Sequence, residues 1–290
     1  MCIRDSARRR HVAHISNALV MLIADQEFVW GARTYVMGIL NVTPDSFSGD
    51  GVAGQPSKIR ERIHRLVDEH PDVLDIGGES TRPGASCVSV DTEISRVLPA
   101  IEMAQSIAAH VPISVDTRRA RVAQKAIEAG ANMINDVSGS MHDPELVDVA
   151  VSAGVPLVVT HNRPAEAMVT PLGGQFRAVE YLNVSEDVLR EGEELCARVV
   201  ARGVDQDLLI FDPGFGFGKT PVQNIQLLQD LALVRQVGFP ILVGVSRKSF
   251  IGELTGQPVE NRLAGSISAA VLGAMRGACL LYTSDAADDT

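Results

Sequence analysis

The chain alternates short apolar runs with helical stretches, and this alternation constrains the fold more than any other feature of the sequence. The runs are rich in Val, Ile and Leu and lack the period-two pattern of half-exposed strands, so both faces of each predicted strand should be buried. Strands are predicted at residues 35–41, 73–80, 112–117, 132–139, 155–161, 208–214 and 240–248. Strands of this kind, each followed by a helix, indicate an α/β protein with a parallel sheet.

Two architectures fit such βα units: a closed (β/α)8 barrel and an open, doubly wound sheet. The length of 290 residues suits a barrel, which typically takes about 250. Polar residues end nearly every predicted strand, and in a barrel these carboxyl ends converge on one mouth. We therefore predict a TIM barrel. Two intervening segments show the apolar spacing of one helix face, at Val122, Ala126 and Ala129 and at Leu263, Ile267, Val271 and Ala274.

Residues 1–26 are predicted to be a leader outside the fold, either disordered or non-native. Arg8-Arg9-Arg10 precedes an apolar run at 15–24, as in a signal peptide, but no small-residue cleavage site follows. We therefore favour an unstructured or docked leader. Residues 27–36 predict a β-hairpin around Gly31-Ala32, which would plug the floor of the barrel.

Composition limits the partners of the chain. The net charge of −10 argues against a nucleic acid or an anionic membrane surface as a partner, although a local site can oppose the overall charge. No apolar run approaches the roughly 20 residues that span a bilayer. The four cysteines are widely separated and form no C-x-x-C, so we expect neither a disulfide framework nor a zinc site, and we expect a cytoplasmic protein.

The stretch FDPGFGFGKT, residues 211–220, resembles a phosphate-binding P-loop but does not match it. The P-loop pattern requires Gly, four residues of any type, and then Gly-Lys-Ser/Thr, and here Pro213 stands in place of the first Gly. We predict instead that Asp212 is the functional residue of this stretch. The loop after it should place Phe215 and Phe217 at the mouth.

Three carboxylates, Asp75, Asp116 and Asp212, lie at or near the ends of predicted buried strands. Burying an ionised carboxylate costs several kcal/mol unless it is paired or hydrogen-bonded. A metal cluster would provide this compensation, and so would a heterocycle with several adjacent N–H donors. Asn135 supplies both a donor and an acceptor nearby.

Positive charge is predicted at the same mouth. Arg247 and Lys248 precede a predicted helix start, where anions bind, and Lys219 and Arg82 would add to them. Such a mouth suits a phosphorylated or carboxylated substrate. His161 is more readily explained as structural, and no motif of a nucleophilic triad or zinc hydrolase is present.

Two connections rich in Pro, Gly and Ser follow polar strand ends, at residues 43–57 and 80–91. Tolerated surface insertions would have this composition, and so would mobile lids over a site. Arg82 and the hydroxyls of Ser80 and Thr81 favour lids.

Six motifs resemble those of dihydropteroate synthases, in family order and over about residues 27–278: VMGILNVTPDSFSGDG, LDIGGESTRPGA, ISVDT, INDVSG, FDPGFGFGKT and VGVSRKSFIG. The resemblance implies a (β/α)8 barrel domain at 27–278. It also implies an enzyme that joins a 7,8-dihydropterin pyrophosphate ester to p-aminobenzoate and releases pyrophosphate, in folate biosynthesis. The implied reaction is dissociative: pyrophosphate leaves first, and the amine then attacks.

The resemblance also implies roles for individual residues. The pterin would be held by Asp116, Asn135, Asp212, Lys248 and Asp75. Asn41 would help to bind Mg²⁺ and the pyrophosphate, and it would act in catalysis with Asp116, Asp212 and Lys248. The p-aminobenzoate pocket and the lids would include Thr81, Arg82, Phe217, Lys219 and Ser249.

The C-terminal segment departs from the family pattern. The family carries an Arg-x-His motif on the last strand, followed by a final helix, whereas here no Arg or His follows Arg276. Residues 279–290 and the initial MCIRDS resemble translated sequencing-adapter sequence, and resequencing the gene tests this. The apolar residues 279–283 can occupy the eighth strand position, but we expect an incomplete last βα unit, poor stability and low activity. A homodimer is expected when the native C-terminus is present.

Three other functions fit parts of the pattern. A pterin-dependent methyltransferase shares the barrel and the pterin-binding carboxylates, and a corrinoid requirement would reveal it. A pterin-binding protein without catalysis would explain the missing Arg-x-His motif. A Schiff-base aldolase would use Lys248, and borohydride trapping tests for it.

Overall fold

A computed structural model of the chain describes residues 19–43, 55–79, 87–163, 167–169, 175–177 and 180–283. Parallel strands form its central sheet, in the order β10-β7-β6-β5-β4-β3-β12-β11. Their bounds are β3 (Tyr35–Asn41), β4 (Val73–Gly77), β5 (Ile113–Asp116), β6 (Met133–Asp136), β7 (Leu157–Thr160), β10 (Leu209–Asp212), β11 (Leu242–Gly244) and β12 (Leu280–Thr283). A parallel bridge between Phe211 and Ile241 joins the two outer strands, and the Phe211 amide donates to the Pro240 carbonyl at 2.9 Å. The sheet therefore closes into the predicted barrel.

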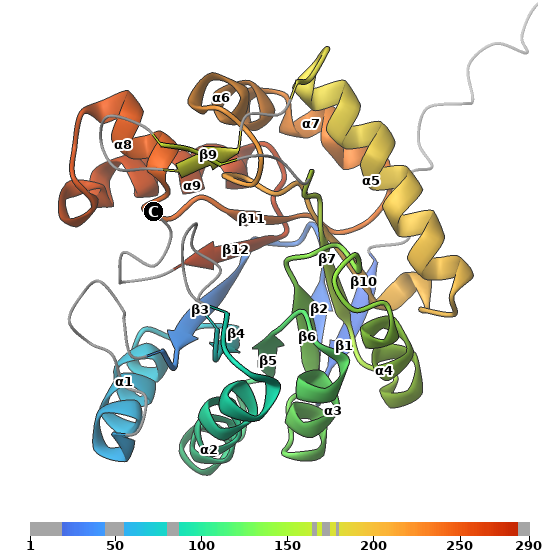
Figure 1. Cartoon of the computed structure of the whole chain (residues 1–290), viewed down its shortest axis with the longest axis vertical. Coiled ribbons are helices and arrows are strands. Elements are labelled where there is room, and N and C mark those ends of the chain that lie inside the picture. Colours follow the sequence, from blue (N-terminus) through green and yellow to red (C-terminus); the bar gives the residue numbers. More distant parts are fainter. Residues whose placement is uncertain are drawn as a thin grey trace, which may run out of the picture.

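Helices surround the sheet, as Figure 1 shows. They are α1 (Pro56–Asp68), α2 (Val90–Ala108), α3 (Ala120–Glu128), α4 (Glu145–Ala153), α5 (Val184–Ala201), α6 (Pro221–Gln229), α7 (Leu231–Val234), α8 (Ser249–Thr255) and α9 (Leu263–Met275). Single 3-10 turns lie at Gln206–Leu208, Arg235–Val237 and Val259–Asn261. Within the described residues, none of the helices is long and apolar enough to cross a membrane.

Burial on both sides explains the strand composition. All five residues of β4 are buried, because one face of the strand points into the barrel and the other toward the helices. The helices cover this outer face with apolar stripes, such as Ile59, Ile63 and Leu66 of α1. Side-chain caps set several helix starts, including a capping box in which Thr220 and Gln223 begin α6.

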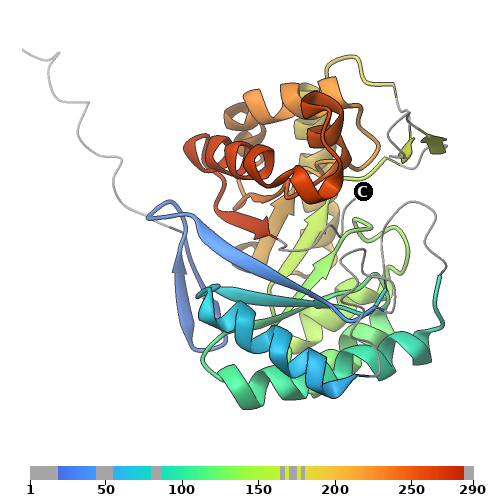
Figure 2. The same ribbon diagram turned by 90° about the vertical axis from the view of Figure 1, so that its left-hand side faces the viewer.

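A β-hairpin closes the amino-terminal end of the barrel, but not the hairpin that the sequence predicted. Strands β1 (Val20–Ile23) and β2 (Gln26–Val29) pair antiparallel around Ala24-Asp25, so residues 20–26 belong to the fold and not to a leader (Figure 2). The turn at Gly31-Ala32 instead leads the chain into β3. Residues 20–23 are apolar at all four positions, so the sequence does not distinguish this strand from the apolar run of a leader.

The hairpin plugs the floor as predicted. Met21, Ile23 and Phe28 are almost fully buried and form one cluster with residues at the strand starts, including Val73, Met133 and Leu242. Phe28 packs against Trp30 and Tyr35, with ring centroids 5.5 and 4.7 Å apart. The hairpin thus fills the end of the barrel opposite the predicted site.

Replacing Met21 with Ala should destabilise the protein by about 2 kcal/mol, because a fully buried side chain would leave a cavity in this floor. The neighbouring Leu22 is 57% exposed on the same strand, so Leu22→Ala should change stability by less than about 0.5 kcal/mol. Urea denaturation of both variants measures the difference. Equal stabilities would show that the hairpin does not pack against the barrel in solution.

The eighth strand is β12, formed by residues of the unusual C-terminal segment. Leu280 pairs with Leu242 of β11 and with Tyr35 of β3, so β12 lies between the first and last strands of the barrel. This confirms that the apolar run at 279–283 can occupy the eighth position, and residues 280–283 are part of the barrel and not of a separate tail. Residues 284–290 lie outside the described part of the chain.

The predicted apolar face of α9 points outward. Leu263, Ile267 and Val271 are each about half exposed, whereas the small residues Ser266, Ala269 and Gly273 face inward. Small side chains let the helix approach the strands closely: a Cβ on Gly273 would lie 3.4 Å from a methyl of Val243. The spacing identified a helix face correctly, but which face packs inward depends on the distance to the sheet.

Candidate active site

The polar residues predicted at the mouth lie at the carboxyl ends of the barrel strands. Asn41, Asp116 and Asp212 are the last residues of β3, β5 and β10, and Asn135 is the penultimate residue of β6. Thr81 and Arg82 lie outside the described residues, as do most of both predicted lids.

Asp75 and Asn135 interact inside the barrel. The Asn135 side-chain amide donates to Asp75 Oδ2 at 3.1 Å, and the Tyr282 hydroxyl donates to the same oxygen at 2.8 Å. Asp75 is fully buried, so in this arrangement it acts through Asn135. The hydrogen bond fixes which end of the Asn135 amide is the donor, and hence how this residue presents itself to a ligand.

Burial raises the pKa of Asp75, and the hydroxyls of Ser114 and Tyr282 and the amide of Asn135 oppose this rise. Asp75 Oδ1 and the Ser114 hydroxyl are buried without a geometrically suitable hydrogen-bond partner. A buried carboxyl group with a raised pKa and an unsatisfied oxygen, next to the carboxyl ends of the strands, is typical of a functional site.

Asn41 and Asp116 approach each other across Gly77, the last residue of β4. A Cβ on Gly77 would lie 3.2 Å from Asn41 Oδ1 and 3.6 Å from Asp116 Oδ2. An amide oxygen and a carboxylate oxygen thus lie close to Gly77 at the strand end, and a Cβ there would crowd the Asn41 oxygen. Both are hard oxygen donors of the kind that Mg²⁺ prefers.

The loop after Asp212 is held by side chains on every side. Asp212 Oδ1 accepts the Gly214 amide at 2.7 Å, and Asn224 Oδ1 accepts the Gly216 amide at 2.8 Å. Lys248 Nζ donates to the Phe215 carbonyl at 2.7 Å and lies 4.9 Å from the centroid of the Phe217 ring. Lys248, which follows β11, thus contacts the Asp212 loop.

Two residues of this loop are not where the sequence predicted them. Phe215 is fully buried in the main core and does not reach the mouth, whereas Phe217 is half-buried beside Lys248. Lys219 was predicted to line the p-aminobenzoate pocket and the lids, but it is fully buried beneath the loop. The alternation of Gly and Phe does not show which ring turns inward, because each glycine adopts a positive φ and reverses the chain.

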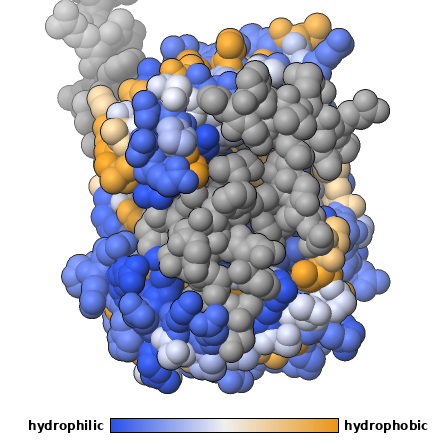
Figure 3. Space-filling model, turned by 60° about the vertical axis from the view of Figure 1, so that its left-hand side comes forward, coloured by the Kyte–Doolittle hydropathy of each residue, from blue (hydrophilic) through white to orange (hydrophobic). Residues whose placement is uncertain are grey.

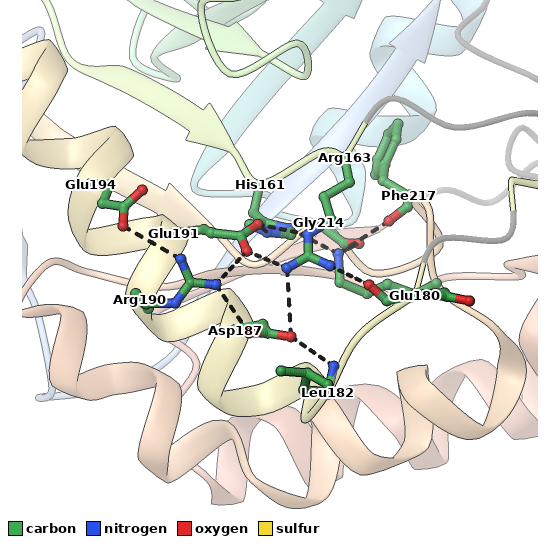
Figure 4. Close-up of polar contacts among 11 residues, drawn as sticks. His161, Arg163, Glu180, Leu182, Asp187, Arg190, Glu191, Glu194, Gly214 and Phe217 are labelled. Atoms are coloured by element: carbon green, nitrogen blue, oxygen red, sulfur yellow. Dashed lines mark hydrogen bonds and ion pairs between the residues drawn. The ribbon is translucent and has the colours of Figure 1, made fainter.

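His161 has the structural role that was favoured for it. The ring lies between Glu191 Oε2, 3.0 Å from Nε2, and Lys219 Nζ, 3.2 Å from Nδ1. Burial and the charge of Lys219 lower the pKa of His161 to about 4. Figure 4 shows Glu191 on α5 also holding Arg163, whose Nε donates to Glu191 Oε2 at 2.8 Å.

The surroundings of this cluster shift the pKa values of both Lys219 and Glu191. Burial lowers the pKa of Lys219 to about 7, although the charge of Asp212 opposes the change. Burial alone would raise the pKa of Glu191, but hydrogen bonds from Arg163 and His161 outweigh it and lower that pKa well below its usual range.

A second ion network supports the base of the second predicted lid. Arg119 pairs with Glu79 and Glu93 and donates to the Val88 carbonyl at 2.9 Å, while Arg118 also pairs with Glu79. This network was not predictable from the sequence, because Glu79, Glu93 and the arginines are distant in the chain and follow no motif. It fixes both ends of the segment between Glu79 and Val88.

The last predicted strand end has a strained backbone. Arg247 has a φ of +52°, its amide donates to the Ser266 hydroxyl at 2.7 Å, and Ser249 is the first residue of α8. A non-glycine residue with positive φ costs about 1 kcal/mol or more, and such strain is concentrated at functional sites.

The fold and the site together define an α/β-barrel enzyme. Carboxylate and amide groups from four separate strands converge at the mouth, with Lys248 beside them. The outer surface seen in Figure 3 is mainly hydrophilic, with separate apolar patches. A buried set of hydrogen-bond acceptors next to an amine is suited to a flat ligand rich in N–H groups.

Comparison with known proteins identifies the family. Residues 37–283 match the profile of the family described as Pterin binding enzyme. The chain is 42% identical over 259 residues to the dihydropteroate synthase of Clostridium beijerinckii, covering 89% of this chain and 91% of that protein. Identity to the Bacillus subtilis dihydropteroate synthase is 41% over 253 residues, covering 87% and 84% of the two chains. The chain therefore belongs to the dihydropteroate synthase family of pterin-binding enzymes.

Solved structures agree with this assignment. The dihydropteroate synthase of Xanthomonas albilineans with 4-aminobenzoic acid superposes with a TM-score of 0.82 at 40% identity, covering 94% of each chain. A second structure of that protein, in complex with 7,8-dihydropteroate, gives a TM-score of 0.74 at 39% identity, covering 89% of this chain and 90% of that one. The expected fold is thus confirmed.

Proposed function

We propose that this protein condenses 7,8-dihydropterin-6-ylmethyl pyrophosphate with p-aminobenzoate to give dihydropteroate and pyrophosphate. The observation that carries this proposal is the convergence of Asp116, Asn135 and Asp212 on one barrel mouth, with Asp75 orienting Asn135. The relatives named dihydropteroate synthase, two of whose structures contain 4-aminobenzoic acid and 7,8-dihydropteroate, support it.

The residues of the mouth would act mainly by binding and orienting the pterin. Asp212 and Asp116 would accept its amino and ring N–H groups, and Asn135 would both donate to the ring edge and accept from it. Lys248 would lie on the carbonyl side. An electron-rich ring held in this way stabilises the cation left when pyrophosphate departs, and the amine of p-aminobenzoate then attacks. Closure of the mouth would exclude water, which competes for the same cation.

We propose Mg²⁺ as the cofactor, held in part by Asn41. The approach of Asn41 Oδ1 and Asp116 Oδ2 across Gly77 fits a small cation that takes oxygen ligands and shares its coordination with a diphosphate. When bound, the ion would neutralise the charge of the departing pyrophosphate. Among the described residues, no group of three or more His, Cys, Asp or Glu side chains is arranged to hold a metal.

Further residues of the p-aminobenzoate site are proposed from the family resemblance. Thr81 and Arg82, with Phe217, would border the p-aminobenzoate pocket. Ser249, at the start of α8, would meet the carboxylate of p-aminobenzoate. We propose no substrate contact for Lys219.

Pyrophosphate release by the purified chain tests the function. Release should require the pterin pyrophosphate, p-aminobenzoate and Mg²⁺ together, and the product should be dihydropteroate by mass spectrometry. Calorimetric titration with the pterin pyrophosphate, run in parallel, separates binding from turnover. Turnover that requires a corrinoid, or a borohydride-trapped adduct on Lys248, would contradict the proposal.

A pterin-binding protein without catalysis is a second candidate, because β12 carries Tyr282 and Thr283 where the family is expected to carry the Arg-x-His motif. Binding of the pterin pyrophosphate without pyrophosphate release would identify it.

We also propose a cytoplasmic protein that forms a homodimer when the native C-terminus is present. Free thiols at Cys87, Cys196 and Cys279 suit a reducing compartment. The exposed apolar row of α9, ending at Met275 with 79% exposure, suits burial against a second copy. Light scattering of the purified protein measures its mass in solution, and a monomer at micromolar concentration would contradict the dimer.

A further inference from the structure

Lys219 is a buried charge for which the proposed reaction gives no role. Its side chain is fully buried beneath the loop that follows Asp212. Its ammonium donates to the Gly214 carbonyl at 2.8 Å, to the Phe217 carbonyl at 3.1 Å and to His161 Nδ1 at 3.2 Å. An ammonium has three donors and no acceptor, so every N–H of Lys219 is used within the protein.

The acceptors of Lys219 are part of the segment that carries the site. Gly214 O and Phe217 O belong to the loop, and the Gly214 amide is bound to Asp212 Oδ1. The Phe217 amide also donates to the Gly214 carbonyl, at 3.1 Å. Gly214 therefore joins Lys219 to both residues at the mouth: its carbonyl accepts from Lys219 and from the Phe217 amide, and its own amide donates to Asp212.

The third acceptor, His161, is held in the form that can accept. Its Nε2 lies 3.0 Å from the Glu191 carboxylate, which can only accept, so Nε2 carries the hydrogen. Nδ1 then has a free lone pair for the Lys219 ammonium. Glu191 is itself fixed by Arg163, which also lies over the Tyr181 ring at 4.0 Å (Figure 4). Lys219 Nζ is thus held by the loop carbonyls on one side and by the oriented His161 ring on the other.

We propose that Lys219 is a positioning residue of the synthase reaction, whose ammonium fixes the 213–218 loop and thereby the places of Asp212 and Phe217 at the mouth. This inference rests on the proposed function, because one of its tests measures binding of the proposed pterin substrate. The lysine that makes this stretch resemble a P-loop turns inward to the carbonyls of its own loop and not outward to a phosphate.

Loss of the ammonium should weaken pterin binding and not only stability. The Phe217 carbonyl and the His161 Nδ1 nitrogen would lose their Lys219 donor, and the Gly214 carbonyl would keep only the Phe217 amide. The loop can relieve this loss of donors by turning its carbonyls toward solvent at the mouth, which moves the Gly214 amide away from Asp212. We expect this displacement of the Asp212 loop to weaken pterin binding about tenfold.

Lys219→Met tests the proposal, because it removes the ammonium and keeps an unbranched side chain. Lys125→Met is the matched control, since Lys125 is about half exposed and pairs with Glu128 on the surface. Lys219→Arg keeps the charge and several donors. For each variant, calorimetry gives the dissociation constant of 7,8-dihydropterin-6-ylmethyl pyrophosphate, and hydrogen exchange with mass spectrometry gives the protection of the loop amides.

We expect Lys219→Met to bind the pterin about tenfold more weakly and to lose loop protection. Lys219→Arg should keep more of the pterin affinity and more of the loop protection than Lys219→Met. Lys125→Met should match the wild type in both measurements. A merely structural role would lower the denaturation midpoint and the active fraction without changing the dissociation constant of the folded fraction, and this result would overturn the proposal. Equal losses in Lys219→Met and Lys219→Arg would also overturn it.

If Lys219→Met does not fold, His161→Gln carries the test. This variant removes the Nδ1 acceptor but leaves both carbonyl bonds of Lys219 in place. Faster exchange at 213–218 would support the proposal, and wild-type exchange would overturn it. If the wild-type chain binds no pterin, the proposed function fails, whereas the exchange measurements still decide whether Lys219 fixes the loop.

Discussion

Replacing Asp212 with Asn should lower kcat/KM for the pterin substrate by about a hundredfold to a thousandfold. The Asp212 carboxylate can only accept hydrogen bonds, and one of its oxygens already accepts the Gly214 amide at 2.7 Å. An Asn side chain would direct an NH2 group either at the Gly214 amide or at an N–H of the ligand. Either orientation places two donors opposite each other, and hydrogen bonds to charged groups contribute about 1.5–3 kcal/mol each.

The substitution should also act on Lys219. The charge of Asp212 raises the pKa of Lys219 against the lowering by burial, so removing that charge should lower this pKa further below its ordinary value. The loop would then be weakened at two points: Lys219 would be charged less often, and the Gly214 amide would lose its carboxylate acceptor at residue 212.

Asp207→Asn is the matched control for Asp212→Asn. Asp207 is exposed in the 3-10 turn that precedes β10, so the same change is made at the opposite end of one strand. Steady-state kinetics and the pterin dissociation constant should be unchanged there. If Asp212→Asn kept its kcat/KM within a few-fold of the control, the pterin would not be bound by this carboxylate.

The barrel was predictable from sequence, because parallel strands buried on both faces have few acceptable compositions. Each of the runs at 35–41, 73–80 and 208–214 contains the observed strand, and the eighth run supplies β12. Their polar ends were predicted to converge because the carboxyl ends of all parallel strands in a barrel lie at the same mouth. No side-chain detail was required, so the positions of Asn41, Asp116 and Asp212 at the strand ends followed from the fold.

The supporting interactions were not predictable in the same way. Lys219, His161 and Glu191 form one cluster although Glu191 lies on a helix 30 residues after His161. The direction in which Lys219 turns depends on the backbone of the glycine loop, where Gly214, Gly216 and Gly218 all have positive φ. A motif read as a string gives the residue types of such a loop, but not which of them face the mouth.

The connection between β7 and α5 was also missed. The structure places a short antiparallel pair in it, β8 (Ala167–Val169) and β9 (Gln175–Arg177). Three-residue strands lack the length that a periodic pattern needs. Arg163 and Tyr181, on either side of this pair, contact each other through a cation–π interaction at 4.0 Å, so both ends of the connection are fixed near the Asp212 loop.

Replacing Gly214 with Ala should destabilise the protein by about 3 kcal/mol or more and abolish pterin binding. Gly214 has a φ of +71°, where an L-residue costs about 1–2 kcal/mol. In addition, a Cβ at this position would lie 2.0 Å from the His161 carbonyl oxygen. That contact involves backbone, and the His161 amide is bound to the Asp212 carbonyl at 2.8 Å, so relief of the clash must move β7 relative to β10.

Gly256→Ala separates the clash from the backbone strain. Gly256 has a φ of +67°, close to that of Gly214, but a Cβ there would meet no atom within 4 Å. It should therefore cost only the conformational term of about 1–2 kcal/mol and leave pterin affinity unchanged. Urea midpoints and calorimetric titration of both variants measure the two effects. If Gly214→Ala were no less stable than Gly256→Ala, the loop after Asp212 would lie farther from His161 than the structure places it, and Lys219 could not join the Gly214 carbonyl to the His161 ring as it does.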